Sequence, residues 1–230
     1  MDHPPHDEEE LPHTELTIRL SDPSQAADAI RALGGWADHL IDTGVISDTA
    51  LVPYRPHVGL WGSRRTLTAA EEVWAADSGV IAYQQARMRT LAPQSVLAAA
   101  NLVAIRTGFH QDVTDGMRWL AAQPKPSSAD RIPTLLLQQA RELIVPGDWA
   151  RLRRTPASRV LVDECWAARH AALNEQRAAL DPAPHIDADA VLRALLTTHL
   201  RLAGEAPDGT AWRLARAVAL ARTRPRRQTT

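Results

Sequence analysis

The chain of 230 residues has a single cysteine, Cys165, which excludes an internal disulfide and a zinc site built from several thiolates. No apolar run approaches the roughly 20 residues that a membrane-spanning helix needs. The formal net charge of −1 lacks the excess of Lys and Arg that generic nucleic-acid binding requires. The nine histidines are scattered rather than spaced as ligand pairs, so we expect no metal. These absences favour a cytoplasmic globular protein that binds neither membranes nor nucleic acids.

Standard catalytic motifs are absent too: there is no Gly-rich phosphate loop, no nucleophile elbow and no HExxH. The amino-terminal segment has no hydrophobic core of a secretory signal. It is acidic, with its negative charges in Asp7–Glu10, and has low hydrophobicity and no period. We therefore expect a disordered acidic arm over residues 1–14.

Two short extended runs flank a helix near the start of the chain. Residues 15–20, ELTIRL, alternate between apolar and polar, which predicts a strand. A helix is expected from about Pro23 to Gly44, and a second strand from about 50 to 54. A strand-helix-strand layer cannot close a sheet by itself. It would be completed elsewhere in the chain or by a second copy in a homodimer.

From Thr68 onward almost every segment favours helix. Thr68-Ala69-Ala70-Glu71 has the pattern of a capping box, which predicts a helix start at Thr68. Further helices are expected at about 94–106, 112–122, 133–143, 157–179, 187–202 and 208–222. The predicted fold class is α+β: a small amino-terminal strand-helix-strand layer followed by a mostly α-helical region. We expect a single domain over residues 15–222 and a basic tail over 223–230.

Two polar residues stand in apolar helix stripes. Asp77 follows Val73 and Trp74 in one stripe, so its carboxylate must find hydrogen-bond donors or bear the cost of desolvation. His199 lies four residues beyond Leu195 in another. Either residue can be explained as a hydrogen-bonded group of the core or as part of a functional site.

Arginines gather between residues 151 and 159 and again in the basic tail. Such clusters are either solvated faces or a dock for an acidic peptide. The residues of the first cluster are Arg151, Arg153, Arg154 and Arg159.

Four blocks along the chain together resemble the glutamate-elimination domain of lanthipeptide dehydratases. They are a strand with Arg19, then Tyr54–Gly62 (YRPHVGLWG), then Ala70–Ser78 (AEEVWAADS), and Leu195–Leu200 around His199. The resemblance covers most of residues 15–220. The central two blocks are its most specific part.

The chain departs from the eliminating members of that family at the residues that handle glutamate. Those members usually carry a Glu and an Arg in the loop after the Tyr, where this chain has His57 and Leu60. It also has Thr17 where a second strand Arg is often found. A guanidinium holds a carboxylate bidentately, and Leu cannot. The same departures are found in a divergent branch, the pyridine synthases of thiopeptide and related macrocycle biosynthesis.

That resemblance implies a formal [4+2] aza-cycloaddition between two dehydroalanines of one modified precursor peptide. Loss of water and of the leader peptide then gives a pyridine-containing macrocycle. One backbone amide must tautomerise, which needs a proton donor and acceptor. Holding both alkenes in contact contributes several kcal/mol, up to about 7–11 kcal/mol in ideal cases. No metal or redox cofactor is required.

From the demands of that reaction we hypothesise roles for individual residues. His199 and Tyr54 would exchange protons with the reacting amide, while Arg19 and His57 orient peptide carbonyls. Substrate contacts would come from Arg55, Trp61, Asp77 and Ser78, and the leader would bind Arg151, Arg153, Arg154 and Arg159. Two alternatives remain: a stand-alone glutamyl-Ser or glutamyl-Thr elimination enzyme, and a non-catalytic scaffold that binds the leader peptide.

Overall fold

The computed structural model describes residues 16–18, 20, 22–52, 54–88, 90–125, 131–207 and 209–223. Contacts divide the chain into two units, residues 1–55 and residues 56–230. The predicted acidic arm lies outside the described residues, as does the basic tail apart from Thr223. The division falls inside the range 15–222, and the assignment of that range to a single domain stays a prediction.

The first unit contains the helix that the sequence predicts. A short 3₁₀ turn, η1 (Pro23–Gln25), leads directly into α1 (Ala26–Asp42). The Asp22 carboxylate accepts a hydrogen bond from the Ser24 backbone N–H at 2.9 Å and so caps the first turn. Gly44 follows the helix with φ +73°, a value that glycine adopts without strain.

The prediction of an α+β fold is wrong, because the described residues contain no strand. Leu16 and Ile18, which were expected on the core face of the first strand, are 59% and 47% exposed. In the second run Leu51 is 81% exposed. The alternation of ELTIRL supplies a period of two, but a strand also needs a partner, and none is found among the described residues.

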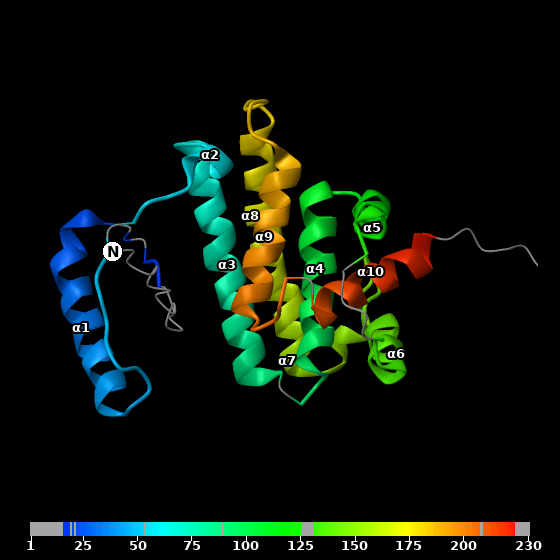
Figure 1. The fold of residues 1–230 in the computed structure, drawn as a ribbon, viewed down its shortest axis with the longest axis horizontal. Coiled ribbons are helices and arrows are strands. Elements are labelled where there is room, and N and C mark those ends of the chain that lie inside the picture. Colours follow the sequence, from blue (N-terminus) through cyan, green and yellow to red (C-terminus); the bar gives the residue numbers. More distant parts are fainter. Residues whose placement is uncertain are drawn as a thin grey trace, which may run out of the picture. The chain divides into compact units, whose positions relative to one another are not determined.

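The second unit is a helical assembly (Figure 1). Its elements are α2 (Val58–Trp61), α3 (Arg65–Arg87), α4 (Gln94–His110), α5 (Val113–Ala122), α6 (Thr134–Leu143), η2 (Leu152–Arg154), α7 (Pro156–Val160), the π-helical segment η3 (Leu161–Cys165), α8 (Trp166–Leu180), α9 (Ala188–Leu202) and α10 (Thr210–Thr223).

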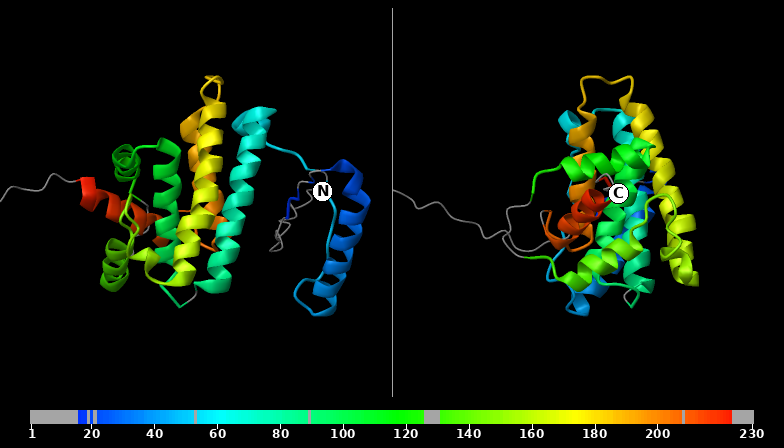
Figure 2. Two further views of the ribbon diagram at one scale, coloured as in Figure 1. Left: turned by 180° about the vertical axis from the view of Figure 1, so that it is seen from behind. Right: turned by 90° about the vertical axis from the view of Figure 1, so that its right-hand side faces the viewer.

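Helix α4 forms the centre of this unit. It contacts α5, α8, α9 and α10, while α3 lies along α8 (Figure 2). Residues 96–103 of α4 are buried without interruption, from Val96 to Val103. A helix that is apolar on all sides is typical of a buried position, and three consecutive alanines at 98–100 allow neighbouring helices to approach closely.

The structure moves one predicted helix start. Helix α3 begins at Arg65, so Thr68 lies inside it and the predicted capping box at Thr68–Glu71 is wrong. The preceding Arg64 has φ +52°, and Thr66 Oγ1 donates to the Ser63 carbonyl at 3.0 Å. The helix therefore begins three residues before the predicted start at Thr68.

Other helix starts are confirmed. The Asp187 carboxylate accepts from the Asp189 backbone N–H at 2.9 Å and caps α9. At Thr155 a reciprocal hydroxyl pair with Ser158 forms a capping box, after which Pro156 opens the segment α7–η3–α8. Within the described residues, no helix combines the length and the apolar composition needed to cross a bilayer.

Candidate functional site

A buried carboxylate, Asp77 on α3, is the centre of a polar network inside the second unit. Arg169 on α8 donates from Nη1 to Asp77 Oδ1 at 2.6 Å. His199 on α9 places Nδ1 2.9 Å from Asp77 Oδ2. All three residues are almost completely buried, with 5%, 1% and 0% exposure for Asp77, Arg169 and His199. The expectation that Asp77 finds donors is confirmed.

The network continues through amide side chains to a fourth helix. Arg169 donates from Nη2 to Asn101 Oδ1 on α4 at 2.9 Å. Asn101 in turn donates from Nδ2 to Gln84 Oε1 on α3 at 3.0 Å, and to the Leu97 carbonyl at 3.1 Å. Hydrogen bonds of this kind offset part of the cost of burying the Asp77–Arg169 ion pair. They connect α3, α4, α8 and α9.

Electrostatics keep Asp77 ionised. Burial alone raises the pKa of its carboxyl, but His199 and Arg169 together outweigh that effect and lower the pKa to about 2. An ionised carboxylate only accepts hydrogen bonds, so His199 Nδ1 carries the proton that faces Asp77. In a neutral ring, His199 Nε2 is then the free acceptor. It is buried and has no hydrogen-bond partner among the described residues.

We expect the protein to lose stability in acid through Asp77. Folding depresses the pKa of this carboxyl from 3.8 to about 2, so its contribution is present above pH 3.8 and is lost as the pH falls toward 2. The difference corresponds to about 2 kcal/mol of unfolding free energy. Urea unfolding measured between pH 5 and pH 2.5 checks this.

The control for the acid effect is an exposed carboxylate. Replacing Asp181, whose side chain is 66% exposed, by Asn should leave the acid slope close to that of the wild type. Asp77→Asn should flatten the slope. Equal slopes for the wild type and Asp77→Asn would contradict the assignment.

The Tyr54–Gly62 block, which contains several predicted site residues, is divided between the two units after Arg55. Tyr54 is 46% exposed and Arg55 is also exposed; both belong to the first unit. In the second unit, His57 precedes α2 and is exposed, whereas Trp61 is 5% exposed. The Trp61 ring packs edge-on against Trp74 with centroids 4.8 Å apart.

The four arginines of the 151–159 cluster differ in their contacts. Arg153 donates to Asp163 Oδ1 at 2.7 Å and to the Asp148 carbonyl at 2.5 Å. Arg151 lies 3.3 Å from Glu142 Oε2. Arg154 and Arg159 are exposed. Two of the four cations therefore already have anionic partners.

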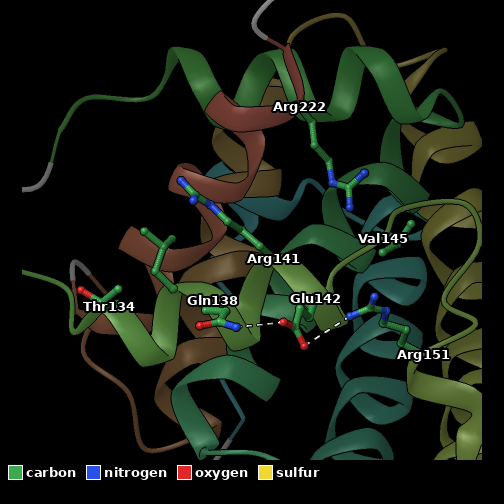
Figure 3. Close-up of a pocket in the computed structure, with 8 residues that line it drawn as sticks. Thr134, Gln138, Arg141, Glu142, Val145, Arg151 and Arg222 are labelled. Carbon is green, nitrogen blue, oxygen red and sulfur yellow. Dashed lines mark hydrogen bonds and ion pairs between the residues drawn. The ribbon is translucent and has the colours of Figure 1, made fainter. Parts of the chain in front are cut away.

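Arg151 instead joins a groove between α6 and α10, which we call the α6–α10 groove (Figure 3). Its volume is about 520 Å³. Glu142 accepts from Gln138 Nε2 at 3.2 Å and pairs with Arg151 (dashed lines in Figure 3). The lining residues are Thr134, Leu137, Gln138, Arg141, Glu142, Val145, Arg151 and Arg222. Three guanidinium groups and one carboxylate thus line the groove, and Arg151 is paired with that carboxylate.

Comparison with known protein families decides the affiliation of the chain. Residues 6–218 match the family described as Lantibiotic biosynthesis dehydratase C-term. The chain belongs to this family. No curated protein and no solved structure matches it.

Membership places this lantibiotic dehydratase C-terminal domain in the biosynthesis of ribosomally made, post-translationally modified peptides, and it is consistent with a peptide partner. The resemblance seen in the sequence is confirmed at the level of the family. No group of three His, Cys, Asp or Glu side chains in the described ranges could hold a metal ion.

Of the predicted site residues of this family member, the structure brings Asp77 and His199 together. Ser78, the next residue along α3, is exposed. Arg19 lies outside the described residues. The proton-transfer and substrate-binding roles assigned to all of these residues stay predictions.

Two members of the buried network in this domain, Asn101 and Arg169, were not predicted from the sequence. Asn101 had a recognisable signal, because it interrupts the apolar run from Val96 to Ile105 of α4. A lone amide in such a run needs partners inside the core. Arg169 had no such signal: α8 also carries Arg177 on its partly buried surface, and only the fold shows which guanidinium is enclosed.

Proposed function

We propose that the protein is a pyridine synthase of ribosomal peptide biosynthesis. It would join two dehydroalanines of a modified precursor by a formal [4+2] aza-cycloaddition, with loss of water and leader peptide. Family membership and one structural observation support this proposal. Leu60, at the position where eliminating relatives usually carry an Arg, packs against the hydrophobic core. That position therefore presents no cation to a departing glutamate.

The exposed residues around that position suit contacts with a peptide. His57 is exposed at the start of α2, and the half-exposed Tyr54 precedes it by three residues. An imidazole and a phenol can each donate and accept a proton at a tautomerising amide. Arg19 and His57 would orient carbonyl groups of the peptide, and Arg55 would contact it.

In this proposal Asp77 orients His199 and leaves Nε2 as the ring atom that can take a proton. This is the arrangement of an orienting carboxylate and a general base. Because His199 is fully buried, it reaches the peptide only if the packing around α9 opens.

The test is mass spectrometry of a leader-bearing peptide with two dehydroalanines. We expect the intact peptide to disappear and a product lacking water and leader to form. His57→Ala and Tyr54→Phe should slow the reaction about 100-fold, the lower end of general acid–base effects. Arg201→Gln, a change at an exposed residue of α9, is the matched control and should leave the rate unchanged.

The outcomes distinguish a synthase from an elimination enzyme and test the role of His199. A peptide that binds but is never converted contradicts the synthase. If His199→Ala forms pyridine at the wild-type rate, His199 has no part in the chemistry. Formation of dehydroalanine from a glutamylated peptide would instead identify an elimination enzyme.

A second candidate is a non-catalytic scaffold that carries the leader peptide to a partner enzyme. The complete burial of His199 and its bond to Asp77 favour this candidate, because both features suit a structural histidine. Leader binding without turnover of the doubly dehydrated peptide would support it.

A further inference from the structure

Arg222, near the end of α10, borders two hollows of the second unit. It lines the α6–α10 groove of about 520 Å³, and it also lines a smaller hollow of about 260 Å³. The smaller hollow is bounded by Val113, Thr114, Met117, Arg118, Pro146, Arg222 and Thr223. We call the two hollows, which share Arg222 as a bordering residue, the track.

The charge of this track is positive. Arg141 has no hydrogen-bond or ion-pair partner among the described residues, whereas Glu142 is engaged by Arg151 and Gln138. Arg222 donates from Nη2 to the Ile144 carbonyl at 3.0 Å. That contact fixes the guanidinium at the end of α6 and leaves its other N–H groups available. Figure 3 shows Arg141 on α6 and Arg222 on α10, with their guanidinium groups pointing to opposite sides.

The walls are not uniformly polar. Leu137 and Val145 line the larger hollow, and Met117 lines the smaller one. Apolar contacts beside guanidinium groups suit a chain that alternates carboxylates with apolar side chains better than they suit an inorganic anion. The formal net charge of −1 disfavours a long polyanion such as nucleic acid.

We propose that this track binds an acidic peptide segment in extended form, with its carboxylates at Arg141 and Arg222. Bidentate guanidinium–carboxylate pairs would fix its register, and Leu137, Val145 and Met117 would hold apolar side chains between them. The natural ligand would be the leader of the precursor. That last assignment rests on the proposed function, whereas the binding of acidic peptides does not.

The test uses a fluorescein-labelled peptide of alternating Glu and Leu and measures fluorescence anisotropy with the full chain. Arg141→Gln and Arg222→Gln should each weaken binding about three- to tenfold, since both pairs would be partly exposed. Arg222→Lys keeps the charge and should lose less. Arg201→Gln removes the same charge from an exposed residue of α9 and should bind like the wild type.

Two further measurements complete the experiment. Raising NaCl from 50 to 300 mM should weaken binding, because exposed charges are screened. A matched peptide with Gln in place of Glu should bind at least tenfold more weakly. Equal binding of the Glu and Gln peptides overturns the proposal. So do an unchanged affinity in both Gln variants and full displacement of the peptide by equimolar inorganic phosphate.

Failure here is distinguishable from failure of the proposed function. Pyridine formation by an Arg141→Gln, Arg222→Gln double variant at wild-type rate and wild-type KM for a leader-bearing substrate would remove the track from leader recognition and leave the synthase intact. Specific binding of the acidic peptide with no conversion of any dehydroalanine substrate would keep the track and reject the synthase.

Discussion

Replacing Asp77 with Ala should lower the free energy of unfolding by about 3–5 kcal/mol, because the change leaves the buried Arg169 guanidinium without its counter-charge. It also removes the acceptor for His199 Nδ1. A domain of this size has about 5–15 kcal/mol of stability in total, so the variant should be close to unfolding. Urea denaturation followed by circular dichroism measures the loss.

A double-mutant cycle separates the pair from the rest of the core. Asp77→Leu and Arg169→Met should each be strongly destabilising, since each leaves one buried charge without its partner. The combination of Asp77→Leu with Arg169→Met should lose much less than the two single losses together, because no buried charge remains. The exposed Asp181→Ala should change stability by under about 0.5 kcal/mol. Additive losses in the double variant would contradict the coupling.

The second large effect is expected at Gly62, which follows α2 and is the last residue of the Tyr54–Gly62 block. Gly62 has φ +74° and ψ −159°, a region that residues with a Cβ rarely adopt. A Cβ there would also overlap Thr66 Oγ1 and Ile186 Cδ1. Backbone strain and overpacking together should cost about 2–6 kcal/mol in Gly62→Ala, measured by thermal and urea unfolding.

Gly59 provides the matched control for Gly62. It lies in α2, three residues earlier, and a Cβ added to it meets no atom within 4 Å. Gly59→Ala should be neutral or raise stability by up to about 1 kcal/mol, because Ala is the better helix former. Equal stability of Gly59→Ala and Gly62→Ala would show that the turn after Trp61 tolerates a side chain.

Helical periodicity was a reliable guide where it was sustained. The predicted helices near 94–106 and 187–202 correspond to α4 and α9, because each carries a long apolar face that the fold buries. The two strands were wrong for a different reason. Alternation over six residues states which side chains share a face, but a sheet also requires a partner strand that local sequence does not specify.

The candidate site was predictable in part for similar reasons. Asp77 and His199 stood out because each interrupts an apolar stripe, and the structure joins them at 2.9 Å. The α6–α10 groove was not predictable, because it depends on Arg141 and Arg222. These two residues are distant in sequence, and they line the same groove only because α6 packs on α10.

The π-helical segment η3 has a consequence for the ion pair. Trp166 N–H bonds to the Leu161 carbonyl five residues back, so one turn of the α7–η3–α8 segment holds an additional residue. An α-helix rotates by about 100° per residue. Removing one residue from Leu161–Cys165 would therefore rotate α7 by roughly that angle about the axis of α8. If α7 kept its place, Arg169 would instead turn away from Asp77. The wide turn therefore sets the rotation of α7 relative to Arg169 on α8.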